Sequence, residues 1–578
     1  MGTRWIVEGT IDPRWPINTR GNVGEVFPEV LTPLSYRLGV LAAEKAWRDA
    51  YAELGVVKRG DFVTNDPVIV GLYGGYAYLN LSFLRILGVR APGSSAEAID
   101  VAFFGEGNPP PYEPRKGDRS LGSTLRILKS VLGALGTRSL PPMVAHSFAL
   151  ADAHRDRCPS LDAPDEDLLA YLHAFPAGFG PAFHNHMLSS ALTSIVAGIL
   201  AGACGAAGDP GLVTHLIGSA GDVRSAQYSK DLYGIARFVR DEPRVAAAFD
   251  DGLAEGYAGL DARLGSGAAA DDFRERFAAF VVEHGHRGPN DWELSSRNWE
   301  NTPELALVAI DRMRLADHDL HPSTRLADDA ERRDEAVAAV RPHVKGLDRR
   351  NFDKALAAIG WWEQAREATR DRAIHIGAPT KRAYRELVRR AAQRGGDPDP
   401  VRVALLDPID ELPAYLADPA PFADALAERG ALFDRYSAVE PRFFITSQDE
   451  VPTLEELEAD HAARTAATPA AAGEVLTGDA GCRGVARGRA RIVRDPADAV
   501  DLEPGDVLVA PITDPAWTPL FLPSAAVVVD VGALLSHAVI VARELGIPCV
   551  VAVEGATTRI PDGAMVEVDG TAGTVTLL

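Results

Sequence analysis

The sequence predicts a multidomain protein in which a mostly α-helical N-terminal part is followed by a compact α/β domain. Three observations lead to this prediction: the length of 578 residues, a change of residue pattern near position 460, and a series of short apolar runs after it. A chain of this length is long enough for several domains with cores of their own. We therefore divide it into residues 1–460, a linker at 461–475, and residues 476–578.

The N-terminal part carries helical periodicity interrupted by proline and glycine. The clearest helical segments are 33–54, 271–282, 379–393 and 421–436. Strand signals are few there, and the short apolar runs 67–72 and 403–406 fit either a strand or the end of a helix. We therefore expect a helical domain that contains little sheet.

An uncharged stretch at 187–208 is about as long as a membrane span. It is rich in Ala, Gly, Ser and Thr, and Gly198 with Gly202 allows close packing of helices in a membrane or in a protein core. We favour a buried helix and expect no membrane partner. The chain opens without a signal peptide, and its four cysteines show no paired spacing, so the expected location is the reducing cytoplasm.

The net charge of −22 argues against nucleic acid or an anionic membrane as the main partner. Any binding of phosphate must therefore come from local arginines. The histidine pairs His184 with His186 and His284 with His286 have a spacing that matches no usual set of metal ligands, so we predict no metal site on this chain.

The predicted linker is rich in alanine and contains Pro469, although the same alanines can extend a helix. After it the pattern changes to short strands, which we predict at 487–493, 507–510, 526–529, 549–553, 565–568 and 574–578. This part of the chain is therefore expected to form a compact α/β domain on a tether.

His537 lies in the most informative segment of that domain. Ser536 is a good N-cap, and Gly546 followed by Pro548 ends the predicted helix, so the histidine occupies the first helical turn. The helix dipole there favours an anion and disfavours the imidazolium. Because a neutral imidazole is a nucleophile and a phosphorylated one is an anion, the position suits a residue that carries a phosphoryl group. From these residues alone, a solvated histidine beside an ordinary cap is the other interpretation.

Residues 477–578 resemble the phosphohistidine, or swivelling, domain of the phosphoenolpyruvate-utilising enzymes, among them pyruvate phosphate dikinase and rifampin phosphotransferase. The matching segments occur in family order: 484–491, 504–511, 513–515, 517–519, the His537 segment and 569–573. The resemblance implies that His537 is phosphorylated during turnover. We expect Ser536 and Arg543 of the same segment to take part in substrate binding.

Three segments of the N-terminal part, 22–34, 221–226 and 284–290, resemble the substrate-binding domain of rifampin phosphotransferase-like proteins. Asn22 and Glu25 lie between glycine and proline, in a segment predicted to be a loop. Glu25 can accept a proton from a substrate hydroxyl, with Asn22 as a substrate-binding neighbour. A pair that only structures the loop is the open alternative.

The 284–290 segment follows a predicted amphipathic helix. Arg287 can hold a transferring phosphoryl group through charge-assisted hydrogen bonds, and His286 can act as acid, base or hydrogen-bond donor. Gly288 is expected to let the backbone approach a ligand.

Five basic residues gather in this acidic chain: Arg366, Arg370, Arg372, Lys381 and Arg382. A surface that docks an anionic group is one interpretation. We favour a solvated helix face, because Glu363, Glu367 and Asp371 lie at helical spacing to these cations.

The sequence contains neither a recognisable ATP-grasp domain nor a P-loop. We therefore expect a separate ATP-grasp subunit that holds ATP and Mg²⁺ and charges His537, an organisation similar to phenylphosphate synthase-like systems. The resemblance implies that ATP yields AMP and phosphate while the phosphoryl group passes to a small-molecule alcohol or phenol. The competing hypothesis is a non-catalytic phosphocarrier or ligand-sensing regulatory protein.

Overall fold

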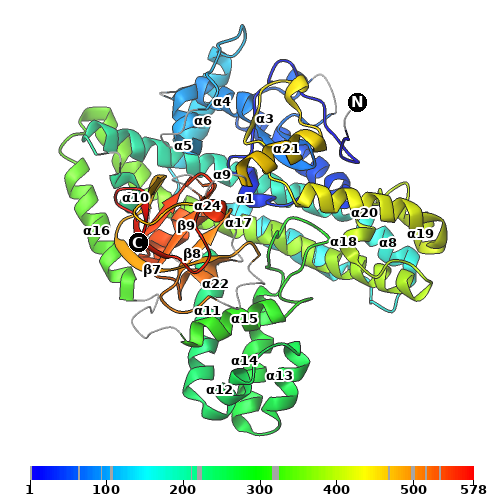
Figure 1. The fold of residues 1–578 in the computed structure, drawn as a ribbon. Coiled ribbons are helices and arrows are strands. Elements are labelled where there is room, and N and C mark those ends of the chain that lie inside the picture. The colour runs from blue at the N-terminus through cyan, green and yellow to red at the C-terminus, as the bar shows by residue number, and fades with distance from the viewer. Residues whose placement is uncertain are drawn as a thin grey trace.

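The computed structural model describes residues 3–62, 66–92, 94–104, 109–209, 211–217, 224–315, 324–465, 469–495, 502–513, 517–532 and 536–578. Parts of three segments quoted above, namely 221–223, 514–516 and 533–535, lie outside the described residues. Figure 1 shows a large helical body with a small sheet domain, coloured orange to red, packed against it. The predicted fold class is therefore confirmed.

Two long helices, α9 (Phe175–Ala206) and α17 (Gly346–Gln393), form the spine of the helical part. They pack against each other, α3 (Leu41–Glu53) packs on α9, and α7 (Pro142–Asp156) packs on both. The segment Asp165–Ala206 is long and apolar enough to cross a membrane, but half of its most apolar window is buried inside the protein. The stretch predicted as a buried helix is therefore part of a longer helix with one side in the core.

The helix predicted to begin at residue 379 begins instead at Gly346, and Pro379 lies inside it. A proline in a helix removes one backbone hydrogen bond and crowds the preceding turn. Here that cost is offset because both flanks of the proline, Ala378 and Thr380, are buried in the core. Tertiary packing thus overrides the local signal.

The helical part also contains a four-stranded sheet with the order β2-β3-β1-β4. Its strands are β1 (Asn18–Thr19), β2 (Val70–Tyr73), β3 (Tyr76–Asn80) and β4 (Phe444–Ile445). Gly74 and Gly75 join β2 to β3 with φ angles of 55° and 80°, a hairpin turn that glycine adopts without strain. Because β1 pairs with β3 and β4, the beginning and the end of the helical part meet in one sheet.

A helical lobe lies at the bottom of Figure 1. It contains the helices α11 (Arg224–Asp241), α12 (Pro243–Asp250), α13 (Gly256–Leu264), α14 (Ala268–His284) and α15 (Glu304–Leu315). Their apolar core is continuous with residues that cover one face of the α/β domain. The two regions are therefore packed together in this structure.

The remaining helical segments of the first part are short or peripheral. They are α1 (Val23–Val26), α2 (Pro33–Ser35), a π-helical turn (Tyr36–Val40), α4 (Leu81–Arg90), α5 (Ala96–Phe104), α6 (Leu121–Leu135), α8 (Asp165–His173), α10 (Leu212–Ile217), α16 (Thr324–Val340), α18 (Pro400–Val403), α19 (Leu412–Ala417), α20 (Ala423–Ser437), α21 (Leu454–Thr465) and single 3-10 turns at Arg59–Asp61, Ala420–Phe422 and Gln448–Glu450. The open segment 67–72 thus contributes to a strand, and the segment 403–406 begins at the end of α18.

The α/β domain contains an eight-stranded sheet with the order β5-β12-β11-β7-β8-β9-β10-β6. Its elements are β5 (Val475–Thr477), β6 (Asp479–Cys482), β7 (Val485–Ile492), β8 (Val507–Ala510), α22 (Thr518–Phe521), β9 (Ala526–Val529), α23 (His537–Leu545), β10 (Cys549–Val551), α24 (Ala556–Arg559), β11 (Met565–Asp569) and β12 (Thr574–Leu577). Strands β7 to β10 are parallel, and the outer strands are antiparallel. All six predicted strands are present, whereas β5 and β6 were not predicted.

The residues predicted as a linker are ordered at both ends. The helix α21 extends to Thr465, and the amides of Ala470 and Gly473 donate hydrogen bonds to Arg559 and Leu577 of the α/β domain. The helix predicted from alanine content is thus present at the start of the segment.

Candidate functional site

His537 is the first residue of α23, as its sequence neighbours predict. Ser536 has an extended backbone and its side chain accepts a hydrogen bond from the amide of Val539, at 3.5 Å. Gly546 ends the helix in a left-handed conformation, with φ of 62°. The imidazole is therefore held at a helix N-terminus, beside backbone N–H groups that favour an anion.

Each ring nitrogen of His537 meets a threonine hydroxyl. Thr513 Oγ1 lies 3.2 Å from Nδ1, and Thr518 Oγ1 lies 3.1 Å from Nε2. The ring of Phe521 packs edge-on at 6.0 Å between centroids. Since a neutral imidazole has one donor and one acceptor nitrogen, while a hydroxyl can serve as either, both contacts can be satisfied at once.

The environment keeps this imidazole neutral. Burial is the main reason why the pKa of His537 is lowered to about 3, and the positive charges of Arg370 and Arg287 lower it further, against the opposing charge of Glu367. At physiological pH one ring nitrogen therefore presents a lone pair. A partly buried, neutral histidine at a helix N-terminus is chemically competent to act as a nucleophile.

Glu25 reaches His537 from the helical part. The backbone N–H of His537 donates a hydrogen bond to Glu25 Oε2 at 3.0 Å, so this carboxylate occupies the anion-favouring end of α23. Glu25 lies on the single helical turn α1, which corrects the predicted loop. Asn22, at the start of that turn, has a φ of 66°, is exposed, and makes no capping hydrogen bond with its side chain.

Arg287 follows α14 and is buried behind Tyr228, with its Cζ 5.6 Å from the centroid of the ring. Nη2 of Arg287 lies 3.0 Å from Asp291 Oδ2, and Nη1 lies 3.7 Å from Asp371 Oδ1. Burial acts to lower the pKa of Arg287, but the surrounding acidic groups outweigh it and raise the pKa overall. Within the described part of the chain, Nε of Arg287 has no hydrogen-bond acceptor, so the guanidinium keeps a donor that could bind an anionic oxygen.

The structure places His286 against α17. Its Nε2 lies 2.9 Å from Asp371 Oδ1, and its ring lies 4.9 Å from that of His375. Burial opposes ionisation of Asp371, but His286, Arg372 and Arg287 together hold the pKa of its carboxyl well below its usual range. His286 thus belongs to a buried charge cluster beside Arg287, and this contact does not connect it to His537.

Two further predicted residues lie in structural contacts. Gly288 lies close to other backbone, since an added Cβ would lie 2.7 Å from the carbonyl oxygen of Arg297. Arg543 lies in the last turn of α23, where its Nε donates to the carbonyl oxygen of Gly481 at 2.8 Å. The structure therefore places Arg543 at the opposite end of the helix from His537.

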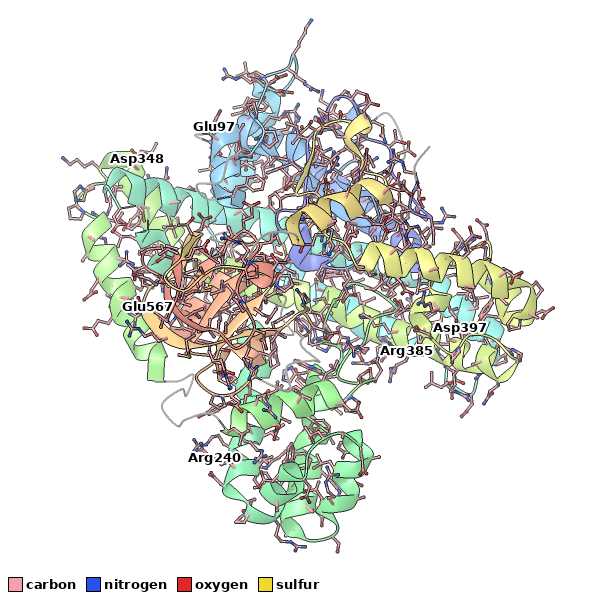
Figure 2. All side chains as sticks on the ribbon, viewed as in Figure 1. Glu97, Arg240, Asp348, Arg385, Asp397 and Glu567 are labelled. Atoms are coloured by element: carbon pink, nitrogen blue, oxygen red, sulfur yellow. The ribbon has the colours of Figure 1, made fainter. Side chains whose placement is uncertain are left out.

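The basic cluster on α17 is not the solvated face that we favoured. Asp348, near the start of the helix, lies at the outside of the molecule in Figure 2. Further along the helix, however, five charged side chains are buried: Glu363, Glu367, Asp371, Arg372 and Lys381. Arg370 of the same helix is the cation with the largest electrostatic effect on His537. The helical spacing of these charges was visible in the sequence, but the side of the helix that faces the core was not.

Among the described residues, no group of three or more His, Cys, Asp or Glu side chains can hold a metal ion. Two of the histidines with the i and i+2 spacing differ in environment: His184 contacts Glu53 at 3.0 Å, whereas His186 is buried.

Comparison with known proteins gives two domain matches. Residues 183–373 match the rifampicin phosphotransferase fourth domain, and residues 502–573, which include His537, match the mobile domain of PEP-utilising enzymes. This chain contains a PEP-utilising enzyme mobile domain. Both resemblances inferred from the sequence are thus confirmed, and we refer to residues 476–578 as the mobile domain and to residues 1–460 as the helical part.

Similar proteins occur in several bacteria. An uncharacterized protein of Mycobacterium tuberculosis is 28% identical over 98% of this chain and 62% of its own length. The prodigiosin synthesizing transferase PigC of Serratia marcescens is 27% identical over 99% of this chain and 64% of its own length. A rifampicin phosphotransferase of a Streptomyces species is 30% identical over 62% of this chain and 40% of its own length. The chain spans less than two thirds of the length of these relatives.

Proposed function

We propose that this protein transfers a phosphoryl group from ATP, through His537, to a hydroxyl group of an organic small molecule. AMP and phosphate are the by-products, so that ATP, the acceptor alcohol and water give AMP, phosphate and the phosphate ester. The observation that carries the proposal is the neutral imidazole of His537 at a helix N-terminus, in a mobile domain that is packed against a surface with Arg370 and Arg287 near the ring.

In the first step His537 is phosphorylated at a site away from the helical part, against which it lies in this structure. A separate ATP-grasp subunit would bind ATP together with Mg²⁺. One ring nitrogen of His537 would attack the β-phosphorus there, the bond from that phosphorus to the oxygen of AMP would break, and the γ-phosphoryl group would pass to water as phosphate. For this the mobile domain must leave Glu25, because the same histidine cannot lie in two active sites at once. The apolar strands of the mobile domain give it a core of its own, which lets it move as one body.

In the second step the charged domain returns to the helical part. Glu25, 3.0 Å from the amide of His537, accepts the proton of the acceptor hydroxyl, whose oxygen then attacks phosphorus. The positive charges of Arg287 and Arg370 balance the charge of the transferring group. Positioning and electrostatics do most of the work in such phosphoryl transfers.

The test combines the purified full chain with candidate ATP-grasp proteins, ATP, Mg²⁺ and a panel of alcohols and phenols. We expect formation of AMP that depends on the acceptor and is abolished in His537→Gln, while His343→Gln, which changes an exposed histidine, behaves as wild type. Label that stays on His537 with every acceptor would point to the phosphocarrier hypothesis. Label on another residue, or none with any donor protein, would contradict the proposal.

A further inference from the structure

A chain of three hydroxyl and imidazole groups crosses between the two parts of the molecule. Tyr228, on α11, places its hydroxyl 2.9 Å from Thr518 Oγ1 of the mobile domain, and that oxygen lies 3.1 Å from His537 Nε2. The first member belongs to the helical part and the other two to the mobile domain. The complete chain therefore exists only while the mobile domain is docked.

The ring of Tyr228 is firmly placed. It is 3% exposed, and Trp299 and His284 pack against it at 5.5 and 6.4 Å between ring centroids. The guanidinium of Arg287 lies 5.6 Å from the same ring. A side chain held on three sides keeps its hydroxyl directed at Thr518 without further ordering on docking.

The direction of the hydrogen bonds follows from acidity. Burial is the main cause that raises the pKa of Tyr228 to about 12, so the phenol keeps its proton. A phenol is a stronger donor and a weaker acceptor than an aliphatic hydroxyl, so Tyr228 donates to Thr518. Thr518 in turn donates to Nε2, and Nδ1 then carries the ring proton and donates to Thr513 Oγ1, 3.2 Å away.

We propose that Tyr228 is a positioning residue that acts through Thr518 to keep the lone pair of His537 on Nε2 when the mobile domain is docked on the helical part and His537 carries no phosphoryl group. This inference rests on the proposed phosphoryl transfer. In that step the bond from phosphorus to Nε2 breaks and its electron pair returns to Nε2, while the acceptor oxygen bonds to phosphorus and its proton passes to Glu25. Thr518 donates to the restored lone pair, and because Nδ1 keeps its proton, the leaving group is a neutral imidazole.

The first test compares Tyr228→Phe with Tyr233→Phe, a buried tyrosine on the same helix. Full-length protein with ¹⁵N-labelled histidine is observed by NMR, and the signals of His537 are assigned from their loss in His537→Gln. We expect a single tautomer with an unprotonated Nε2 in wild type and in Tyr233→Phe, and a mixture in Tyr228→Phe. An unchanged tautomer in Tyr228→Phe would overturn the proposal.

The second test charges His537 with phosphoramidate and follows the loss of the phosphoryl group to water. We expect discharge about three- to tenfold slower in Tyr228→Phe, the effect of one neutral hydrogen bond. Thr518→Val should slow discharge equally, and the double variant should be no slower than either single one. Equal rates in Tyr228→Phe and Tyr233→Phe, or additive effects, would contradict the inference. If wild-type His537 is not phosphorylated, the proposed function fails, but the tautomer comparison still decides the role of Tyr228. If Tyr228→Phe does not fold, Thr518→Val replaces it in both tests.

Discussion

The two sides of the candidate site are built in opposite ways. In the mobile domain, strands β8 and β9 are buried along their whole length and wholly apolar, and a single titratable ring emerges at the start of α23. In the helical part, α17 carries acidic and basic side chains into the core beside that ring. The difference fits the proposed function, in which the apolar mobile domain would carry one reactive group and the charged surface would receive it.

The first and largest test of this contrast is Asp371→Ala in the helical part. The change removes the carboxylate shared by His286, Arg287 and Arg372, and leaves buried positive charges without it. We expect a loss of about 3–5 kcal/mol in the free energy of unfolding, measured by urea denaturation.

The control for this change is Asp353→Ala on the same helix, where the ion pairs with Arg341 and Arg349 are exposed. An exposed pair contributes about 0–1 kcal/mol. Equal losses of unfolding free energy in Asp371→Ala and Asp353→Ala would mean that the buried charges of α17 stabilise the fold no more than the exposed ones do.

Asp530 of the mobile domain has a raised pKa, and it should make stability depend on pH. Burial raises the pKa of Asp530 to about 6 from the ordinary 3.8, despite hydrogen bonds from Thr557 that lower it. The folded state therefore binds a proton that the unfolded state has released, so stability should fall as pH rises from about 4 to about 6, by at most about 3 kcal/mol. Thermal unfolding of wild type and Asp530→Asn across this range measures the effect, and parallel curves for the two proteins would refute the assignment.

Removing apolar volume from the sheet should cost less than removing the buried charge. Val528→Ala, in the fully buried strand β9, is expected to lower the free energy of unfolding by about 2 kcal/mol through lost burial and a small cavity. Val485→Ala is the matched change at a residue that is 58% exposed, and it should have almost no effect. A similar loss at both sites would contradict the described core.

The smallest effect concerns the electrostatic contact between the two sides. Since Arg370 contributes to lowering the pKa of His537, Arg370→Gln should raise that pKa, although burial should keep it below the ordinary value. An NMR titration of His537 in both proteins measures the change. Arg382→Gln, an exposed neighbour paired with Glu300, is the control, and an unchanged titration in Arg370→Gln would show that the charges of α17 do not reach the mobile domain.

The sequence predicted the mobile domain better than the helical part because its signals are local. The cap at Ser536, the stop at Gly546 and the apolar strands β8 and β9 each depend on a few neighbouring residues, and the structure has them where they were expected. The other side of the site joins residues far apart in the chain. No local pattern predicts the contact of His286 with Asp371 or that of Tyr228 with Thr518. In α17, Pro379 and the dense charges both suggested a shorter, solvated helix, and packing overrode both signals.

The pairing of β1 with β4 has a consequence for the proposed movement of the mobile domain. It ties the end of the helical part to the strand just before Glu25, and Leu454 at the start of α21 is bound to Thr3 in the same region. In the proposed phosphoryl transfer, the mobile domain would therefore leave and return to the same corner of the molecule. A connection rooted there would hold His537 at a high effective concentration near Glu25.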